Sequence, residues 1–320
     1  MSRQIQVEQG VPRLVEAAAV PLAADAVRVK VSRAGVNFWE VMQLRGKVPL
    51  PANGVPGSEG SGVILEVGPA VTGLASGTRV AWSKVPGSYA DEVVGPATSF
   101  VAVPADVGDD TAAALLFQGL TAAYLAHETW PTRPGDVAVV TAAAGGVGVL
   151  LTQHLVASGA SVIGAVSSAH KVAAAQEAGA SHVLLYGDTL ADDVRALAPG
   201  GVAVVYDAVG AGVAEPLIAT LRPRGALVLY GSASGQEADV SARDLGAGSY
   251  FLTRTAGRDY LGDAEQVRSA SARLLDLAAA GTLRPLVGAT YALADVQHAW
   301  DDLGSRASVG KLLLTLADPA

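Results

Sequence analysis

The first third of the chain carries short apolar runs separated by turn residues, a pattern typical of β-structure. Residues 27–31 alternate apolar and polar positions with a period of two, as a half-buried strand does. Residues 62–68, 78–82 and 89–94 are further short runs, and a stretch rich in proline and glycine at 49–57 marks a long irregular loop. This spacing predicts a small, strongly curved β domain.

From about residue 106 the pattern changes to an alternation of strands and helices, which is typical of a doubly wound parallel sheet. An Ala-rich helix is expected after 109–111 and a second helical run around 119–125. A long helix at 264–280 and a last strand at 309–316 complete the chain. The alternating strands are predicted at 137–140, 161–166, 182–186, 202–207 and 226–230, with helices at 146–158, 169–178, 191–197 and 215–221.

Composition narrows the class of protein. The length of 320 residues favours two domains at roughly 150 residues each. Half of the residues are hydrophobic and the mean hydropathy is +0.36, so the chain can build large cores. A net charge of −8 disfavours nucleic acid as a partner, because phosphate backbones select a basic face. The absence of cysteine excludes disulfides, thiolate nucleophiles and Cys-ligated metal sites.

No segment predicts membrane association. Residues 1–16 contain several charges and no apolar leader, so we expect a cytoplasmic protein. Residues 137–170 contain no Asp, Glu, Lys or Arg, but glycines and His154 interrupt the run. We interpret this stretch as a buried strand–helix–strand unit rather than a membrane span.

The sharpest chemical signal is a run of small residues between a predicted strand and a predicted helix. The run ends in Ala144, Gly145, Gly146, Val147 and Gly148. Small residues let the backbone approach a pyrophosphate, and the helix N-terminus offers free N–H groups. The glycine pattern alone is weak, but its place after a strand and before a helix favours a dinucleotide site.

The end of the next strand discriminates between dinucleotides. An NAD enzyme usually places Asp or Glu there, whereas this chain has Ser167, Ser168 and Lys171. These donors suit a 2′-phosphate, and each charge-assisted bond is worth about 1.5–3 kcal/mol. The cofactor predicted here is therefore NADPH. The alternative is that Lys171 is a solvated helix residue and one of the serines only a helix cap.

Many motifs in one order resemble the zinc-free quinone oxidoreductases of the medium-chain dehydrogenase/reductase superfamily, which include zeta-crystallin. The resemblance covers nearly the whole chain. It is carried by residues 34–38, 56–62, 87–91, 118–122, 142–148, 166–168, 205–207, 221–225, 251–254 and 310–311.

The resemblance implies an α/β fold that joins a Rossmann-type doubly wound parallel sheet to a GroES-like β-barrel domain. Residues 1–117, completed by 258–320, would form the GroES-like substrate and catalytic domain, and 118–257 the Rossmann domain. The active site would lie in the cleft between them. The resemblance also implies a homodimer that pairs the edges of the Rossmann sheets at residues 249–255.

The resemblance also implies roles for single residues. Asn37 corresponds to an Asn near the nicotinamide and the reacting carbonyl, although it could instead be only a turn former. Typical relatives carry Asp and two Tyr along the segment after it, where this chain has Glu40, Met42 and Val48, with Trp39 beside them. We expect these four to line a more apolar substrate pocket. Further cofactor contacts are implied for Tyr186, Ser232, Phe251, Leu252 and Lys311.

No metal site is expected. Zinc-containing relatives place His directly after Pro-Gly, where this chain has Ser58, and its histidines lack ligand-like spacing. The resulting hypothesis is zinc-independent hydride transfer from NADPH to a small quinone-like molecule. An enone or enoyl reductase in a biosynthetic pathway, or a catalytically weak NADPH-binding sensor or structural protein, remain alternatives.

Overall fold

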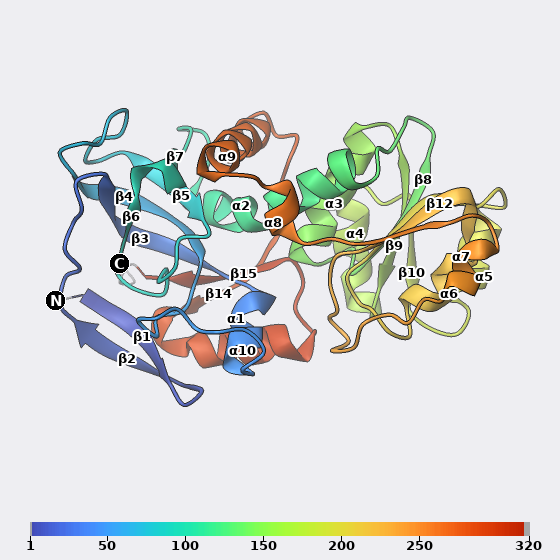
Figure 1. Cartoon of the computed structure of the whole chain (residues 1–320), viewed down its shortest axis with the longest axis horizontal. Coiled ribbons are helices and arrows are strands. Elements are labelled where there is room, and N and C mark those ends of the chain that lie inside the picture. The colour runs from blue at the N-terminus through green and yellow to red at the C-terminus, as the bar shows by residue number, and fades with distance from the viewer. Residues whose placement is uncertain (1, 317–320) are drawn as a thin grey trace. The chain divides into compact units, whose positions relative to one another are not determined.

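The computed structural model describes residues 2–316, and the chain divides into two compact units. Unit 1 comprises Met1–Leu120 and Asp263–Ala320, and unit 2 comprises Thr121–Gly262. Each unit has its own hydrophobic core. Figure 1 shows the strands and helices of each unit.

Unit 1 is built on a seven-stranded sheet in which β14, β15, β3, β4, β5 and β7 are successive neighbours and β6 pairs with β3. A separate two-stranded sheet joins β1 and β2. The strands are β1 (Ser2–Glu8), β2 (Val11–Ala17), β3 (Ala26–Val36), β4 (Glu59–Val67), β5 (Arg79–Ser83), β6 (Glu92–Pro96), β7 (Phe100–Ala102), β14 (Val287–Ala292) and β15 (Lys311–Thr315). The helices are α1 (Phe38–Leu44), α9 (Ala264–Ala279), α10 (Val296–Ser305) and α2 (Asp109–Tyr124), which continues into unit 2, with 3-10 turns η1 (Ala97–Ser99) and η4 (Leu293–Asp295).

Large aromatic side chains fill the core of unit 1. Trp82 and Phe100 lie with ring centroids 5.5 Å apart, and Tyr89 lies 6.0 Å from Trp300. The Tyr89 ring is fully buried and its hydroxyl donates to the carbonyl of Gly35. Tyr89 is thus a packed core residue.

Unit 2 is a six-stranded parallel sheet in the order β10-β9-β8-β11-β12-β13, which confirms the predicted doubly wound sheet. Its strands are β8 (Val137–Thr141), β9 (Ser161–Val166), β10 (His182–Leu185), β11 (Val202–Asp207), β12 (Leu221–Leu229) and β13 (Phe251–Arg254). Its helices are α3 (Gly146–Ala157), α4 (Val172–Glu177), α5 (Leu190–Leu197), α6 (Ala214–Ile218), α7 (Ala242–Gly246) and α8 (Gly257–Tyr260), with a π-helical turn η2 (Leu125–Thr129) and a 3-10 turn η3 (Ala169–Lys171).

The inner strands β8, β9 and β11 of unit 2 are buried along most of their length, as strands covered on both faces of a parallel sheet usually are. Helices α5 and α6 contact each other and share one apolar cluster with strands of the sheet (Figure 1). Helices α3 and α4 contact each other and strand β9. The strand order reverses between β8 and β11, and in such sheets ligands bind beyond the carboxyl ends of the strands at this reversal.

The helices expected at 109–116, 119–125 and 215–221 differ from those in the structure. The helical runs expected around 109–116 and 119–125 form one helix, α2, because Gly119 does not break it. A Cβ at Gly119 would lie 3.1 Å from Leu274, so the glycine allows α9 to approach closely. The helix expected at 215–221 ends at Ile218, since Leu221 already pairs with Val202 in β12.

Within the described residues, none of the helices combines the length and the apolar character that crossing a bilayer requires.

Candidate functional site

The glycine loop of unit 2 joins β8 to α3 as the sequence predicts. Gly145 is the N-cap of α3, with φ −85° and ψ 170°, and α3 has no acidic residue in its first turn. The first helical hydrogen bond runs from Val149 N to Gly145 O at 2.9 Å. The N–H groups of Gly146, Val147 and Gly148 therefore precede the intrahelical ladder and are available to an anion.

Glycine at position 148 is required by packing against the loop itself. A Cβ on Gly148 would lie 2.3 Å from the carbonyl oxygen of Ala142 and 2.8 Å from the Cα of Ala143. Gly145 is less tightly placed, because a Cβ there would lie 3.2 Å from the same oxygen. Ala142 itself has a left-handed φ of 49°, so the chain turns sharply just before the buried Ala144.

Two side chains hold this loop in place. The amide of Ala142 donates to the hydroxyl of Tyr186 at 2.6 Å, and burial raises the pKa of that phenol. Thr141 Oγ1 donates to Asp207 Oδ1 at 2.8 Å and accepts from Ala208 N at 2.9 Å. Both contacts lie at the carboxyl ends of strands, so they fix the geometry where a ligand is expected.

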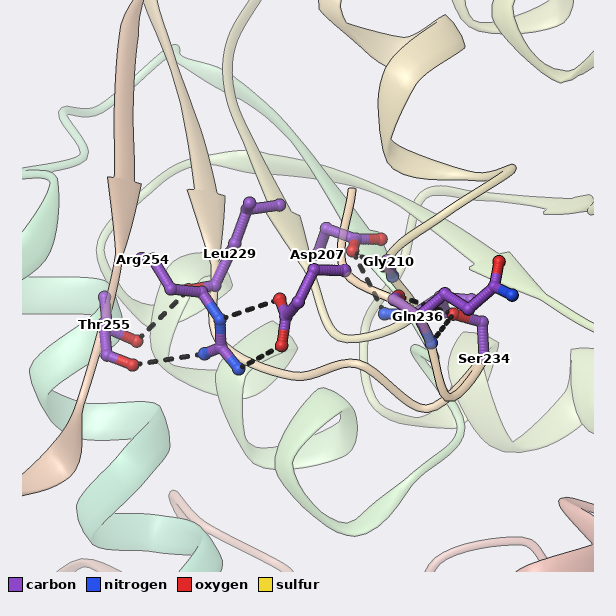
Figure 2. A network of polar contacts seen from close by, with 9 residues as sticks. Asp207, Gly210, Leu229, Ser234, Gln236, Arg254 and Thr255 are labelled. Atoms are coloured by element: carbon purple, nitrogen blue, oxygen red, sulfur yellow. Dashed lines mark hydrogen bonds and ion pairs between the residues drawn. The ribbon is translucent and has the colours of Figure 1, made fainter. Parts of the chain in front are cut away.

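Asp207 is fully buried and acts within the turn that follows β11. Its Oδ2 accepts from Val209 N at 3.1 Å and from Gly210 N at 2.7 Å, and burial raises the pKa of the carboxyl group. Figure 2 shows this turn beside the contacts that end β12 and β13. Asp207 therefore caps the turn that follows β11.

The predicted 2′-phosphate residues follow β9 directly. Ser167 is exposed, Ser168 and Lys171 are half-buried, and Ser168 Oγ lies 3.2 Å from His170 Nδ1. No acidic residue occurs between Val166 and Val172. The donors therefore lie at the end of the strand next to β8, where the ribose of a dinucleotide is expected.

The other predicted cofactor contacts, which follow β12 or begin β13, differ in how exposed they are. Ser232 follows β12 and is half-buried, with its carbonyl accepting from Gly235 N. Phe251 and Leu252 begin β13 and are 51% and 38% exposed. The Phe251 ring lies 5.6 Å from that of Trp130. Arg254, at the end of β13, pairs with Glu237 and donates to the carbonyl of Thr255 (Figure 2).

Unit 1 contains a second candidate site, a buried polar cluster around Asn37. Lys311 Nζ donates to Asn37 Oδ1 at 2.6 Å and forms an ion pair with Glu59. Asn37 Nδ2 donates to Glu59 Oε1 at 3.0 Å, and Gln118 Nε2 donates to Asn37 Oδ1 at 2.6 Å. The backbone N–H of Phe117 donates to the other carboxylate oxygen of Glu59, Oε2, at 3.1 Å. We call Asn37, Glu59, Gln118 and Lys311 the amide cluster.

The amide cluster is almost closed to solvent. The exposed fraction is 3% for Asn37, 0% for Glu59 and 3% for Lys311. Gln118 Oε1 is buried and has no hydrogen-bond partner among the described residues. An unpaired buried acceptor costs about 1–3 kcal/mol, so a ligand that donates to this oxygen gains from it.

Sequence reasoning assigned a role to Asn37 but missed Glu59 and Gln118, and it placed Lys311 only as a cofactor contact. A signal existed, since Glu59 stands in a segment of alternating small residues at 57–62, and Lys311 directly precedes three leucines. Neither pattern reveals that the side chains meet. The structure pairs the Lys311 ammonium inside unit 1, and its cofactor contact stays a prediction.

The residues predicted to line a substrate pocket do not share one environment. Trp39 is 44% exposed, Met42 and Val48 are half-buried, and Glu40 is buried. Glu40 accepts from the backbone N–H of Asn37 at 2.8 Å and from Ser58 Oγ at 3.0 Å. Burial raises the pKa of Glu40 from 4.5 to about 7. Glu40 thus fixes the start of α1 and the backbone of Asn37.

No group of three or more His, Cys, Asp or Glu in the described part of the chain could hold a metal ion. His127 and His154 do lie together, with Nε2 and Nδ1 3.2 Å apart. Burial lowers the pKa of His154 to about 4, so it is neutral at physiological pH. Ser58, at the position where zinc-containing relatives carry His, is instead bonded to Glu40.

Comparison with known proteins gives two family matches. Residues 23–127 match the alcohol dehydrogenase GroES-like domain, and residues 146–275 match the zinc-binding dehydrogenase family. The first match confirms the GroES-like part of the predicted fold, and the second overlaps the parallel sheet.

Relatives align over most of their own length. A 2-haloacrylate reductase from Burkholderia sp is 36% identical over 90% of both chains, and a quinone oxidoreductase from Pseudomonas aeruginosa is 34% identical over 90% of both. Among solved structures, a mycobacterial protein in complex with NADPH superposes with a TM-score of 0.91 at 35% identity, covering 98% of this chain and all of that one. Escherichia coli quinone oxidoreductase, also in complex with NADPH, gives 0.90 at 31% identity with the same coverage.

Proposed function

Because the chain belongs to the quinone oxidoreductase family of the medium-chain dehydrogenase/reductase superfamily, we propose that it is an NADPH-dependent reductase that transfers a hydride to a quinone-like acceptor without zinc. The observation that carries this proposal is the loop 142–148. Its close backbone packing and its three open N–H groups suit a diphosphate.

The preference for NADPH over NADH rests on Ser167, Ser168 and Lys171. Hydroxyls and an ammonium donate to a 2′-phosphate, whereas the carboxylate of an NAD enzyme would repel it. Solved relatives with NADPH bound agree with this assignment. The remaining contacts of the proposed NADPH site come from Asn37, Ala144, Gly145, Gly146, Val147, Gly148, Tyr186, Ser232, Phe251 and Leu252.

When bound, NADPH supplies the hydride. The chain's own residues bind and orient: the N–H groups at the start of α3 hold the diphosphate, and Tyr186 keeps the loop in shape. Asn37 donates a hydrogen bond to the reacting oxygen of the acceptor. Because the oxygens of a hydroquinone are weak bases, water suffices as the proton source and no strong general acid is required.

Zinc independence is supported by the available ligands. The chain has no cysteine, and its Ser58 hydroxyl is bonded to Glu40. Polarisation of the acceptor then depends on hydrogen-bond donors, of which the Asn37 amide is the candidate. Met42 and Val48 stand where typical relatives carry Tyr, and Trp39 lies beside them in the sequence, which favours a larger or more apolar acceptor than benzoquinone.

A second candidate is the reduction of an electron-poor C=C bond. The relative named 2-haloacrylate reductase favours it, because a haloacrylate is an α,β-unsaturated acid. Both reactions use the same cofactor, and they differ in the product. A reduced C=C bond is stable in air, whereas a hydroquinone reoxidises.

The proposed assembly is a cytoplasmic homodimer joined at β13. This strand is at the edge of the parallel sheet, and both Phe251 and Leu252 are exposed there. Pairing of two such edges would cover the unpaired backbone groups. Light scattering of Leu252→Asp against wild type checks it, since a monomeric wild type would rule out the dimer.

The test of function is anaerobic NADPH oxidation against a panel of quinones and enones graded by size, with mass analysis of the products and NADH in parallel. We expect turnover with NADPH and a preference for the larger acceptors. Lys171→Ala should weaken NADPH binding roughly ten- to hundred-fold and leave NADH binding unchanged, since one charge-assisted bond is lost. Lys47→Ala, an exposed lysine of unit 1, is the control. Saturable NADPH binding without turnover of any acceptor would favour a sensor or structural role.

A further inference from the structure

The amide cluster brings together charges from segments that are far apart in the chain. Lys311 begins β15, Glu59 begins β4, and Asn37 follows β3. Lys311 is separated from Glu59 by 252 positions and from Asn37 by 274. Burying an ion pair is seldom favourable for stability, because both charges lose their hydration. A buried pair around a proposed functional side chain therefore points to a role in fixing that side chain.

Donors and acceptors in the cluster determine the orientation of the Asn37 amide. An ammonium can only donate and a carboxylate can only accept. Since Lys311 contacts one end of the amide and Glu59 the other, the oxygen must face Lys311 and the nitrogen must face Glu59. The opposite orientation would place oxygen against carboxylate and nitrogen against ammonium.

In this orientation one N–H of the Asn37 side-chain amide remains available as a hydrogen-bond donor. The two lone pairs of Asn37 Oδ1 are taken by Lys311 and Gln118. One hydrogen of Nδ2 is donated to Glu59, and within the described residues no acceptor is recorded for the other. Asn37 can therefore act toward a ligand only as a donor, and the ammonium on its oxygen makes the amide hydrogen more acidic.

The backbone makes room for this arrangement. A Cβ on Gly35 would lie 2.3 Å from Glu59 Oε1, so the glycine leaves the space that the carboxylate occupies. The N–H of Phe117, in helix α2, donates to the other carboxylate oxygen. Glu59 is therefore held from two sides, which makes it a rigid partner for Asn37.

We propose that Lys311 and Glu59 are positioning residues that hold the Asn37 amide with one Nδ2 hydrogen directed at the reacting oxygen of the acceptor. The inference rests on the proposed function and deepens it. In this proposal Lys311 and Glu59 act on the reaction through Asn37.

The test is a mutant cycle between Asn37 and the pair. Lys311→Met alone would leave Glu59 charged and buried, so the charge-neutral double variant Lys311→Met/Glu59→Gln is used instead, with Asn37→Ala and the triple variant. Loss of one preorganised donor typically lowers kcat about 100- to 1,000-fold, and we expect this for Asn37→Ala. The double variant should lose roughly 10- to 100-fold in kcat at saturating NADPH, because Asn37 is retained but no longer fixed.

The triple variant decides the question. If the pair acts through Asn37, the triple variant has the kcat of Asn37→Ala within about two-fold, since residues that work as a unit are not additive. The proposal would be overturned if the loss of kcat in the triple variant equalled the product of the losses in Asn37→Ala and in the double variant. It would also be overturned if the double variant kept wild-type kcat. Arg79→Met/Asp109→Asn removes an ion pair elsewhere in unit 1 and should keep wild-type kcat.

A second readout needs no turnover. The side-chain amide signals of Asn37, assigned by their loss in Asn37→Ala, should be widely separated and slow to exchange in wild type and should converge in the double variant. Signals that do not change would contradict a fixed amide. If the wild type oxidises NADPH in the presence of none of the tested acceptors, the proposed function itself is refuted. If the wild type is active and the double variant is equally active, only this inference is refuted.

Discussion

The two candidate sites solve the same problem, a fixed set of hydrogen-bond donors, by different means. The loop 142–148 in unit 2 contains no charged side chain and presents backbone N–H groups. The amide cluster in unit 1 uses a buried ammonium and a buried carboxylate to orient a single side chain. A backbone site is therefore sensitive to any added atom, and a charge-held site is sensitive to any change of charge.

The sharpest way to break the backbone site is Gly148→Ala. The added Cβ would lie 2.3 Å from Ala142 O, so the loop must move and the N–H groups lose their alignment. We expect NADPH binding to weaken by roughly 100-fold or more and unfolding to become easier by about 1–3 kcal/mol. Fluorescence titration and urea unfolding measure the two effects. Gly200→Ala, in open space within the same unit, is the control and should bind as wild type.

The pH dependence of stability probes the amide cluster through Glu40, because the Glu40 carboxyl group accepts a hydrogen bond from the backbone N–H of Asn37. The pKa of this carboxyl group rises from 4.5 to about 7 on folding, so between these values the folded state binds more protons than the unfolded state. The contribution of Glu40 to the free energy of unfolding is therefore greatest below pH 4.5. It falls by about 3 kcal/mol in total as the pH rises through 7.

Glu40→Gln should remove that slope. The difference in unfolding free energy between variant and wild type, from urea titrations at a series of pH values, should therefore grow in favour of the variant as pH rises. A difference that is constant with pH would show that Glu40 ionises normally. Glu177→Gln, an exposed carboxylate on α4, controls for net charge.

Gly35→Ala tests whether shape also matters in unit 1. The new Cβ would overlap the Glu59 carboxylate, 2.3 Å away, and would shift it from Lys311 and Asn37. We expect a loss of about 1–3 kcal/mol in stability from overpacking, with kcat reduced and NADPH affinity retained. Gly304→Ala is a suitable comparison, because its Cβ would meet only the end of Arg45. Reduced NADPH affinity instead would mean that the two sites are not separable.

The smallest effect is expected for Tyr186→Phe, which removes the acceptor for the amide of Ala142. One unsatisfied amide costs about 1–3 kcal/mol, so NADPH should bind roughly tenfold more weakly. Calorimetric titration measures the change. Tyr250→Phe is the matched control, since no partner of its hydroxyl is recorded among the described residues and its loss should have no effect.

Several elements could be predicted because their signals are local. The glycine loop, the strand at 161–166 and the strand at 202–207 follow from short-range pattern. The helix at 215–221 was predicted too long, because the pairing of Leu221 with Val202 overrides local propensity. Two helical runs were predicted where the structure has the single helix α2, in which Gly119 allows close packing on α9.

The sequence alone determined the parallel sheet, the glycine-rich turn between β8 and α3, and the family, since each depends on neighbouring residues or on motifs in a fixed order. Only the tertiary structure decided which side chains surround Asn37. Glu59 and Lys311 come from strands that are neighbours of β3 on opposite sides, through antiparallel pairings that no local pattern encodes. Their buried charges fix the amide only once the sheet has formed, because hydrogen bonds of this kind depend on positions in space rather than on separation along the chain.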